Sequence, residues 1–563
     1  MFERNESSRR SERGWRVDTQ SNRKARGAFF TPAEISRYLA QWAIQSANDV
    51  VLEPSCGEAS FLLAAGERLR ALDARPLIWS SQLHGVEIHE DSAIAAQALL
   101  RDAGFDASVT VSDFFDFDDR QKFDAIVGNP PFVRYQQFSG AARTKSLEAA
   151  LAQGVRLSGL ASSWAGFVVK AAQHLSADGR LALVLPAELL SVSYAAEVRN
   201  FLLRRFARVR LIMFEQRVFP EVLEEVVLLL AEGTGGAQCF EVYQTRDAQS
   251  LKAVDLAHWT EHEPAEGEKW TPALVAKSAF ATYREVAARY FEELGVWGRT
   301  YLGAVTGNNK YFTLTADDVR KNGLTQADVT AISPPGSRHM RGLTLTEAAW
   351  KELLRDGSRA LLFYPGEKPS AAALRYIRAG EQANVSDAYK CRVRSPWWRV
   401  PLVEQPDLFL TYMNHDRPRL VTNTAKAQIL NSIYGVRLMD GRRSIGRDLL
   451  PVATLNSVTL LGAEIVGRAY GGGLLKMEPR EADLLPVPSL DHIKSVETEL
   501  RAIKPQLAKH LRHGDVEAAV QSVDAILLAE VANSDLKALR AARDVLFQRR
   551  RARGKNGEDR RSS

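Results

Sequence analysis

The chain has 563 residues, of which 45% are hydrophobic and 25% are charged, an ordinary composition for a soluble protein with about two to four domains. Its three cysteines, Cys56, Cys239 and Cys391, provide neither a disulfide framework nor a CxxC pair for zinc. No apolar stretch approaches the length needed to cross a bilayer, and the charged N-terminus lacks the apolar segment of a signal peptide. We therefore expect a cytoplasmic protein without membrane contact.

The formal net charge of +6 is concentrated at the two ends of the chain. Residues 1–26 carry a net +4 and residues 549–563 a net +5, which leaves −3 for the residues between them. We interpret the ends as a disordered basic arm and a basic tail, since solvated charged segments of this kind do not build a packed core. The overall charge is therefore only weak evidence for a nucleic-acid partner.

Short apolar runs alternate with helical patterns between residues 27 and 240. The apolar runs predict seven strands, at 49–54, 81–88, 107–114, 123–131, 179–186, 209–215 and 224–232. Strands that alternate with helices are typical of a parallel sheet covered by helices. We therefore predict an α/β domain over residues 27–240, with a doubly wound, mostly parallel seven-stranded sheet.

The regular alternation stops after residue 240. Residues 241–294 are polar and mixed, and we interpret them as a connecting segment. From 295 to 490, Gly and Pro interrupt short runs that contain aromatic residues and Arg, which indicates a second domain of mixed α+β structure. Residues 491–548 have helical spacing and predict two or three C-terminal helices.

Three consecutive predicted strands end in polar side chains. Glu53 and Pro54 follow the first strand and precede a turn at Gly57, Glu87 ends the second, and Asp113 ends the third. The carboxyl edge of an open parallel sheet is where ligands bind, and carboxylates there can accept ribose hydroxyls or an adenine amino group. Each residue alone also fits a turn, a solvated strand end or a helix cap, and the turn lacks the GxGxxG spacing of dinucleotide binders. Together they predict a nucleotide-like ligand.

The fourth predicted strand runs into Asn129-Pro130-Pro131-Phe132. The two prolines stiffen the turn and remove two backbone donors. An amino group conjugated to a ring is a poor nucleophile because its lone pair is delocalised; if Asn129 and the Pro130 carbonyl accept both hydrogens, that pair is localised. The ring of Phe132 can stack on the substrate. This turn predicts transfer of a methyl group to an amino group on an aromatic ring. The alternative is a purely structural turn.

The motifs LEPSCG (52–57) and NPPF (129–132) resemble the S-adenosylmethionine-dependent adenine-N6 DNA methyltransferases of bacterial restriction-modification systems, in particular their gamma-type arrangement. GAFFTPAE (27–34) resembles the N-terminal motif of that family, and residues 167–188 and 217–222 also match. The resemblance is looser beyond 240, where VTGNNKYF (305–312), SPWWRVP (395–401) and YGGGLLKM (470–477) look like elements of target-recognition domains. Ala59 stands where the family usually has glycine, and Phe132 where many members have Tyr.

The resemblance implies roles for individual residues. It assigns Asn129, Pro130, Pro131 and Phe132 to catalysis, and it places S-adenosyl-L-methionine against Thr31, Glu53, Pro54, Gly57, Glu87, Ile88, Asp113, Phe114 and Asn129. Within that set, Thr31, Glu53 and Gly57 hold the methionine end. Glu87 holds the ribose, and Asp113 and Phe114 hold the adenine. Phe132 and Phe219 form two sides of a stacking clamp around a base that has left the duplex. The alternative for Phe219 is an ordinary position in the core.

The size of the segment after residue 240 favours double-stranded DNA as the substrate polymer. We expect DNA contacts, each of which could equally be an ordinary surface residue, from Arg338, Arg341, Lys390, Arg392, Arg394, Trp397, Trp398 and Arg399. The family resemblance further implies a bacterial cytoplasmic enzyme with a cognate restriction endonuclease, and we expect a monomer. The scattered histidines indicate no metal site.

Two alternatives stay open at this point. Asn-Pro-Pro-aromatic turns also serve enzymes that methylate RNA bases or protein glutamine, because those groups present the same electronic problem. The fold could instead carry a non-catalytic DNA-binding specificity subunit. We do not expect a fused endonuclease, because the predicted tails and domains leave no segment large enough to form one.

Overall fold

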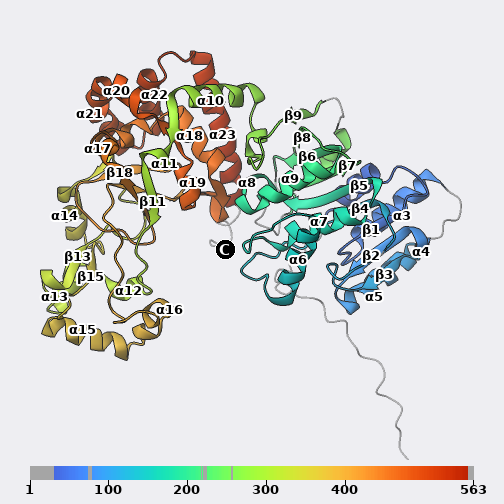
Figure 1. The fold of residues 1–563 in the computed structure, drawn as a ribbon, viewed down its shortest axis with the longest axis horizontal. Helices are drawn as coiled ribbons and strands as arrows, with labels where there is room; N and C mark the ends of the chain where they lie inside the picture. Colours follow the sequence, from blue (N-terminus) through green and yellow to red (C-terminus); the bar gives the residue numbers. More distant parts are fainter. Residues whose placement is uncertain are drawn as a thin grey trace, which may run out of the picture. The chain divides into compact units, whose positions relative to one another are not determined.

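The computed structural model describes residues 31–73, 79–118, 120–216, 218–219, 225–254 and 258–555. The predicted arm at 1–26, the first half of the GAFFTPAE motif, and most of the 217–222 motif lie outside the described residues. The chain divides into two compact units, the first ending at Trp270 and the second beginning at Thr271, and each is considered by itself (Figure 1).

A nine-stranded sheet forms the centre of the first unit, in the order β3-β2-β1-β4-β5-β7-β6-β8-β9. The strands are β1 (Val51–Glu53), β2 (Leu83–Glu87), β3 (Ser108–Val111), β4 (Phe123–Gly128), β5 (Leu175–Pro186), β6 (Arg208–Phe214), β7 (Val226–Glu232), β8 (Phe240–Thr245) and β9 (Thr260–His262). The first five run parallel, and β7 lies antiparallel between β5 and β6. All seven predicted strands are present, which confirms the mostly parallel sheet.

Helices connect these strands and cover the sheet. They are α2 (Ala33–Ala43), α3 (Ser60–Leu72), α4 (Trp79–Gln82), α5 (Glu90–Asp102), α6 (Gly140–Ala152), α7 (Ser163–His174), α8 (Glu188–Ser191) and α9 (Ala196–Arg205). Helix α2 packs on α3, β4 and β5, while α7 packs on β5 and α9. Because both faces of the central strands are covered, β7 is apolar and buried over six consecutive residues.

The prediction of seven strands was too low, because β8 and β9 extend the sheet past residue 240. Strand β8 alternates buried Phe240 and Val242 with half-buried polar neighbours, as expected near a sheet edge. The short β9 has only three residues and carries no apolar run that could reveal it. Phe240 also stacks on Trp270 with ring centroids 4.2 Å apart. Residues after 240 therefore belong to the core of the first unit.

The second unit combines four small sheets with helices, which confirms the predicted mixed α+β structure. Its sheets are β11-β19-β16-β18-β14 (Gly298–Leu302, Tyr434–Leu438, Leu408–Leu410, Leu420–Asn423, Thr344–Leu345), β12-β15-β13 (Thr313–Leu314, Leu361–Phe363, Val329–Ala331), β17-β21-β20 (Met413–Asn414, Leu474–Lys476, Arg468–Tyr470) and β10-β22 (Phe291–Glu293, Pro486–Pro488). A core under the second of these sheets contains Phe312, Phe363, Ile377 and Cys391.

The helices of the second unit are α10 (Lys277–Tyr290), α11 (Leu294–Trp297), α12 (Asn309–Phe312), α13 (Ala316–Lys321), α14 (Glu347–Arg355), α15 (Ala371–Gln382), α16 (Tyr389–Arg392), α17 (Asp440–Ala453), α18 (Ser457–Val466), α19 (Pro479–Asp483), α20 (Leu490–Ser495), α21 (Glu497–His513), α22 (Val516–Leu527) and α23 (Asn533–Lys555). No single helix within the described ranges is long and apolar enough to span a bilayer. Helices α17 and α18 reach that length and composition only as a pair bent by 90°.

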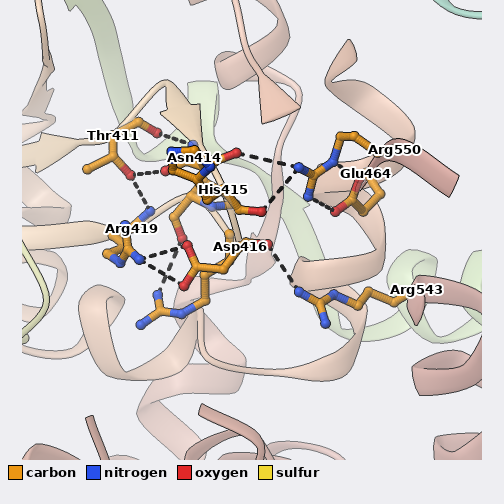
Figure 2. A network of polar contacts seen from close by, with 10 residues as sticks. Thr411, Asn414, His415, Asp416, Arg419, Glu464, Arg543 and Arg550 are labelled. Carbon is orange, nitrogen blue, oxygen red and sulfur yellow. Dashed lines mark hydrogen bonds and ion pairs between the residues drawn. The ribbon is translucent and has the colours of Figure 1, made fainter. Parts of the chain in front are cut away.

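The last helix corrects the predicted start of the basic tail. Helix α23 continues to Lys555, and Arg550 within it is only 2% exposed. Its guanidinium pairs with the buried Glu464 carboxylate at 2.7 Å and donates to the backbone carbonyls of Asn414 and His415 (Figure 2). It also donates to the Gly473 carbonyl. The run of Arg residues suggests a solvated tail by composition, but the helical spacing turns Arg550 inward.

Candidate active site

A cavity of about 300 Å³ opens at the carboxyl ends of β1, β2, β3 and β4 in the first unit. All nine residues expected to hold the cofactor line it, namely Thr31, Glu53, Pro54, Gly57, Glu87, Ile88, Asp113, Phe114 and Asn129. Pro131 lines it as well, whereas Pro130, Phe132 and Phe219 are not among the described residues in its wall. The topology therefore gathers side chains that are up to 98 residues apart in the sequence, as Thr31 and Asn129 are.

The turn after β1 is tied to the end of β2 by Glu87. One carboxylate oxygen of Glu87 accepts the Gly57 N–H at 2.9 Å, and the other accepts the His89 N–H at 3.0 Å. Gly57 has φ +46°, and a Cβ placed there would meet no atom within 4 Å, so the backbone faces open space. Ala59 also takes a left-handed conformation, with φ 58°, which suits the glycine usual in the family. The turn thus leaves backbone bare for a ligand.

Glu53 is the most deeply buried carboxylate of the cavity, at 2% exposure. It accepts the Leu62 N–H at 3.0 Å. Burial raises its pKa well above the usual range, and the nearby negative charge of Glu87 raises the pKa further. Such a carboxyl becomes ionised when a cation is placed beside it, which suits the ammonium group of an amino acid.

Asp113 and Phe114 form the wall beyond β3. Asp113 accepts the Phe115 N–H at 3.0 Å through one oxygen, as a turn residue does, while its other oxygen lies 3.7 Å from Lys145 Nζ. The Phe114 ring stacks on Phe167 of α7, with centroids 5.2 Å apart and planes 27° apart. These rings give the cavity a flat apolar surface beside a carboxylate, which fits a purine with an exocyclic amino group.

Asn129 at the end of β4 combines one satisfied and one unsatisfied polar atom. Its amide nitrogen donates to the Thr31 hydroxyl at 3.2 Å. Its Oδ1 is buried and has no hydrogen-bond partner in the described part of the chain. A buried acceptor without a donor costs free energy, so the site is complete only when a ligand supplies an N–H or O–H.

Ser163 holds the turn that follows Asn129, and sequence analysis did not single it out. Its hydroxyl accepts the Val133 N–H at 2.9 Å and donates to the Pro131 carbonyl, while its own N–H donates to the Val133 carbonyl at 3.1 Å. A serine at the start of a helix is too common for its spacing to reveal this role. The Asn-Pro-Pro-Phe turn is therefore fixed from both sides, by the prolines within it and by α7.

The eight predicted DNA contacts of the second unit fall into two groups. Arg338, Arg341, Lys390 and Arg392 are exposed. Arg394 instead donates to the carbonyls of Thr306 and Trp397, and the Trp397 indole donates to Glu381 at 3.0 Å. Trp398 packs against the core that contains Phe312, and Arg399 lies over its ring at 5.4 Å. The second group thus makes structural contacts inside the protein.

The sheet order, with β7 antiparallel beside β5, and the acidic cavity at the carboxyl ends of the strands are those of a class I S-adenosylmethionine-dependent methyltransferase. Within the described residues, no group of three or more His, Cys, Asp or Glu could hold a metal ion.

Comparisons with known proteins extend this assignment. Residues 16–238 match the N-6 DNA methylase family, and residues 267–528 match the C-terminal domain of the type II methyltransferase M.Eco57I. The chain is 21% identical to M.AccI of Acinetobacter calcoaceticus (82% of this chain, 85% of that protein) and 25% identical to M.XamI of Xanthomonas campestris pv. amaranthicola (83% and 86%). Both are named type II methyltransferases. The DNA-bound structure of the type IIL restriction-modification enzyme MmeI shares the fold, with a TM-score of 0.57, 12% identity and coverage of 92% of this chain and 75% of MmeI.

The chain belongs to the adenine-N6 DNA methyltransferases of restriction-modification systems. It is an enzyme that transfers a methyl group from S-adenosylmethionine to DNA. The RNA, protein and non-catalytic alternatives have no support from these relatives.

Proposed function

We propose that the turn Asn129–Phe132 holds the N6 amino group of an adenine that has flipped out of duplex DNA. The observation that carries this proposal is that Asn129 lines the cavity and has a buried Oδ1 without a hydrogen-bond partner in the described residues. Asn129 Oδ1 accepts one amino hydrogen and the Pro130 carbonyl accepts the other. The nitrogen lone pair is then localised and directed at the methyl donor.

The chemistry of the cavity wall fits S-adenosylmethionine, and the bound cofactor supplies an electrophilic methyl group. In this proposal Glu53 faces the ammonium of the methionine part, with Thr31 and Pro54 beside it. Glu87 accepts the ribose hydroxyls next to Ile88. Asp113 accepts the adenine amino group, and Phe114 stacks on the ring.

Phe132 and Phe219 are proposed as the two sides of the clamp around the flipped base. Both are buried, at 8% and 4% exposure. Stacking between aromatic side chains offsets part of the free energy of unstacking, which is a few kcal/mol. The clamp requires that one of these rings becomes accessible when the base enters.

Residues 295–490 are proposed as the target-recognition domain, with Arg338, Arg341, Lys390 and Arg392 as DNA contacts because their side chains are exposed. A cognate endonuclease, a monomeric state and a bacterial cytoplasmic location stay predictions from the sequence.

Single-molecule sequencing of DNA treated with the purified protein and S-adenosylmethionine tests the function. We expect N6-methyladenine in one shared sequence motif. Methylation of RNA or protein with unmodified DNA would contradict the proposal, as would cofactor binding without turnover on any of the three.

A further inference from the structure

One short turn of the second unit carries the two most exposed large apolar side chains in the described part of the chain. Tyr389 is 65% exposed and Val393 is 61% exposed. They lie four residues apart, and the Val393 N–H donates to the Tyr389 carbonyl at 3.3 Å across helix α16. Residues with this spacing share one face of a helical turn. The two side chains therefore form a single apolar knob.

The core of the second unit holds this knob rigidly outward. Cys391, between Tyr389 and Val393, is fully buried. Arg394 closes the turn from the other side: its guanidinium donates to the Thr306 carbonyl and, at 2.8 Å, to the Trp397 carbonyl. Because these inner residues are fixed, exposing the knob is a property of the fold. It is not a consequence of a loosely packed loop.

Positive charge lies beside the knob within this turn. The segment 389–394 contains Lys390, Arg392 and Arg394 and no acidic residue. Lys390 and Arg392 are exposed, and neither forms an ion pair with another described residue, although Lys390 Nζ lies 5.6 Å from the Tyr389 ring. Neighbouring exposed apolar side chains, unlike single ones scattered over a surface, suit an interaction surface. A partner that satisfies both features must combine apolar faces with closely spaced negative charge.

Duplex DNA has this combination, because its bases lie between two rows of phosphates. Resting on the proposed DNA-binding role of the second unit, we propose that the turn 389–393 is a DNA contact with two separate functions. Tyr389 and Val393 pack against bases, either by wedging between base steps or by contacting their apolar edges. Lys390 and Arg392 contact the flanking phosphates. Arg394 and Trp397 are positioning residues that hold the turn in place.

The salt dependence of binding separates these two functions. The full-length enzyme is titrated onto a duplex that carries the sequence motif that the enzyme methylates. S-adenosylhomocysteine replaces the methyl donor to prevent turnover, and the titration is repeated at several salt concentrations. We expect the Tyr389→Ala/Val393→Ala variant to bind roughly 10- to 100-fold more weakly at every salt concentration, with an unchanged slope of log Kd against log salt. We expect Lys390→Ala/Arg392→Ala to reduce that slope by about 2, since each phosphate contact contributes about 0.9.

Leu374→Ala is the matched control, because Leu374 is a 45% exposed apolar residue of the same unit, on α15. It should bind DNA like the wild type, and Tyr389→Phe should retain most of the affinity. Thermal unfolding and S-adenosylmethionine binding establish that each variant is folded. Wild-type DNA affinity in the Tyr389→Ala/Val393→Ala variant would overturn the inference, and if sedimentation then showed a changed oligomeric state, the knob would belong to a contact between copies of the chain. A wild-type enzyme without sequence-specific DNA binding would instead refute the proposed function.

Discussion

The Thr31 hydroxyl accepts a hydrogen bond from the amide nitrogen of Asn129 at 3.2 Å, and this contact fixes which way the Asn129 amide faces. With the nitrogen held by Thr31, the Oδ1 atom is left buried and without a partner in the described residues. A residue before the first strand therefore orients the acceptor that the proposed chemistry requires. Besides its proposed place next to the cofactor, Thr31 thus affects the reaction through Asn129.

Removing this contact should slow methyl transfer. Thr31→Val keeps the shape of the side chain but loses the hydroxyl, so the Asn129 amide can turn over. One hydrogen bond of this kind contributes about 1 kcal/mol, which corresponds to a decrease in kcat of roughly fivefold to tenfold. Thr31→Ser should restore the rate in single-turnover assays. A Thr31→Val enzyme with wild-type kcat would show that Thr31 does not orient Asn129.

Loss of the Ser163 hydroxyl should also lower kcat. Ser163→Ala leaves the Val133 N–H and the Pro131 carbonyl without the partner that fixes the Asn-Pro-Pro-Phe turn. We expect kcat to fall about tenfold while the Kd for S-adenosylmethionine, measured by calorimetry, changes less than about twofold. Ser193→Ala is a control, because Ser193 is an exposed serine of the same unit. Equal losses of kcat and cofactor affinity would indicate general damage to the cavity.

Replacing Glu53 should separate stability from binding. Burial raises the pKa of Glu53 in the folded state above the unfolded value of 4.5. Below pH 4.5 the carboxyl is protonated in both states and burial carries no ionisation penalty. As the pH rises from 4.5 toward the folded pKa, the unfolded state loses the proton more readily and the folded state loses stability. Glu53→Gln should therefore raise the Tm of the cofactor-free enzyme at pH 8 more than at pH 5. The same variant should bind S-adenosylmethionine at least roughly tenfold more weakly, since it loses a charged hydrogen bond.

Proton release gives an independent test of Glu53. Binding a cation beside a carboxyl whose pKa is raised drives that carboxyl to ionise, so calorimetry in buffers of different ionisation enthalpy should detect protons released on binding. Release should be abolished in Glu53→Gln. Identical proton release by both proteins would remove Glu53 from the ammonium site.

The Arg550–Glu464 pair should make the end of α23 essential for stability. Both side chains are about 3–4% exposed, so Arg550→Ala leaves a buried carboxylate unpaired and should cost about 3–5 kcal/mol of unfolding free energy. Deleting residues 556–563, whose two Arg are balanced by one Glu and one Asp, should leave both Tm and DNA affinity unchanged. Calorimetry measures the thermal stability of both proteins. Equal stability of Arg550→Ala and wild type would contradict the observed burial.

Local sequence patterns predicted the central sheet and its ligand edge. Continuous apolar runs such as β4 and β7 are recognisable because strands buried on both faces need them. Glu53, Glu87, Asp113 and Asn129 could be placed together because parallel strands end at one edge, and all four line the cavity. The roles assigned to them individually stay predictions.

Long-range packing accounts for what the sequence could not predict. Strand β9 forms by pairing with β8, and its own residues carry no strand pattern. Ser163 acts through a turn 30 residues earlier in the chain. Arg394 and Arg550 look like surface cations by composition, but their partners, Thr306 and Glu464, are more than 80 residues away. Such pairings depend on the tertiary fold rather than on local spacing.

Methyl transfer by the Asn129→Ala variant tests the proposed role of Asn129. The variant loses the Oδ1 acceptor, and the other eight cavity residues expected to hold the cofactor stay in place. We expect S-adenosylmethionine binding within about threefold of wild type by calorimetry, with single-turnover methylation of the duplex motif reduced by at least roughly 100-fold. Wild-type methylation by this variant would contradict the assignment of Asn129 as the residue that holds the adenine amino group.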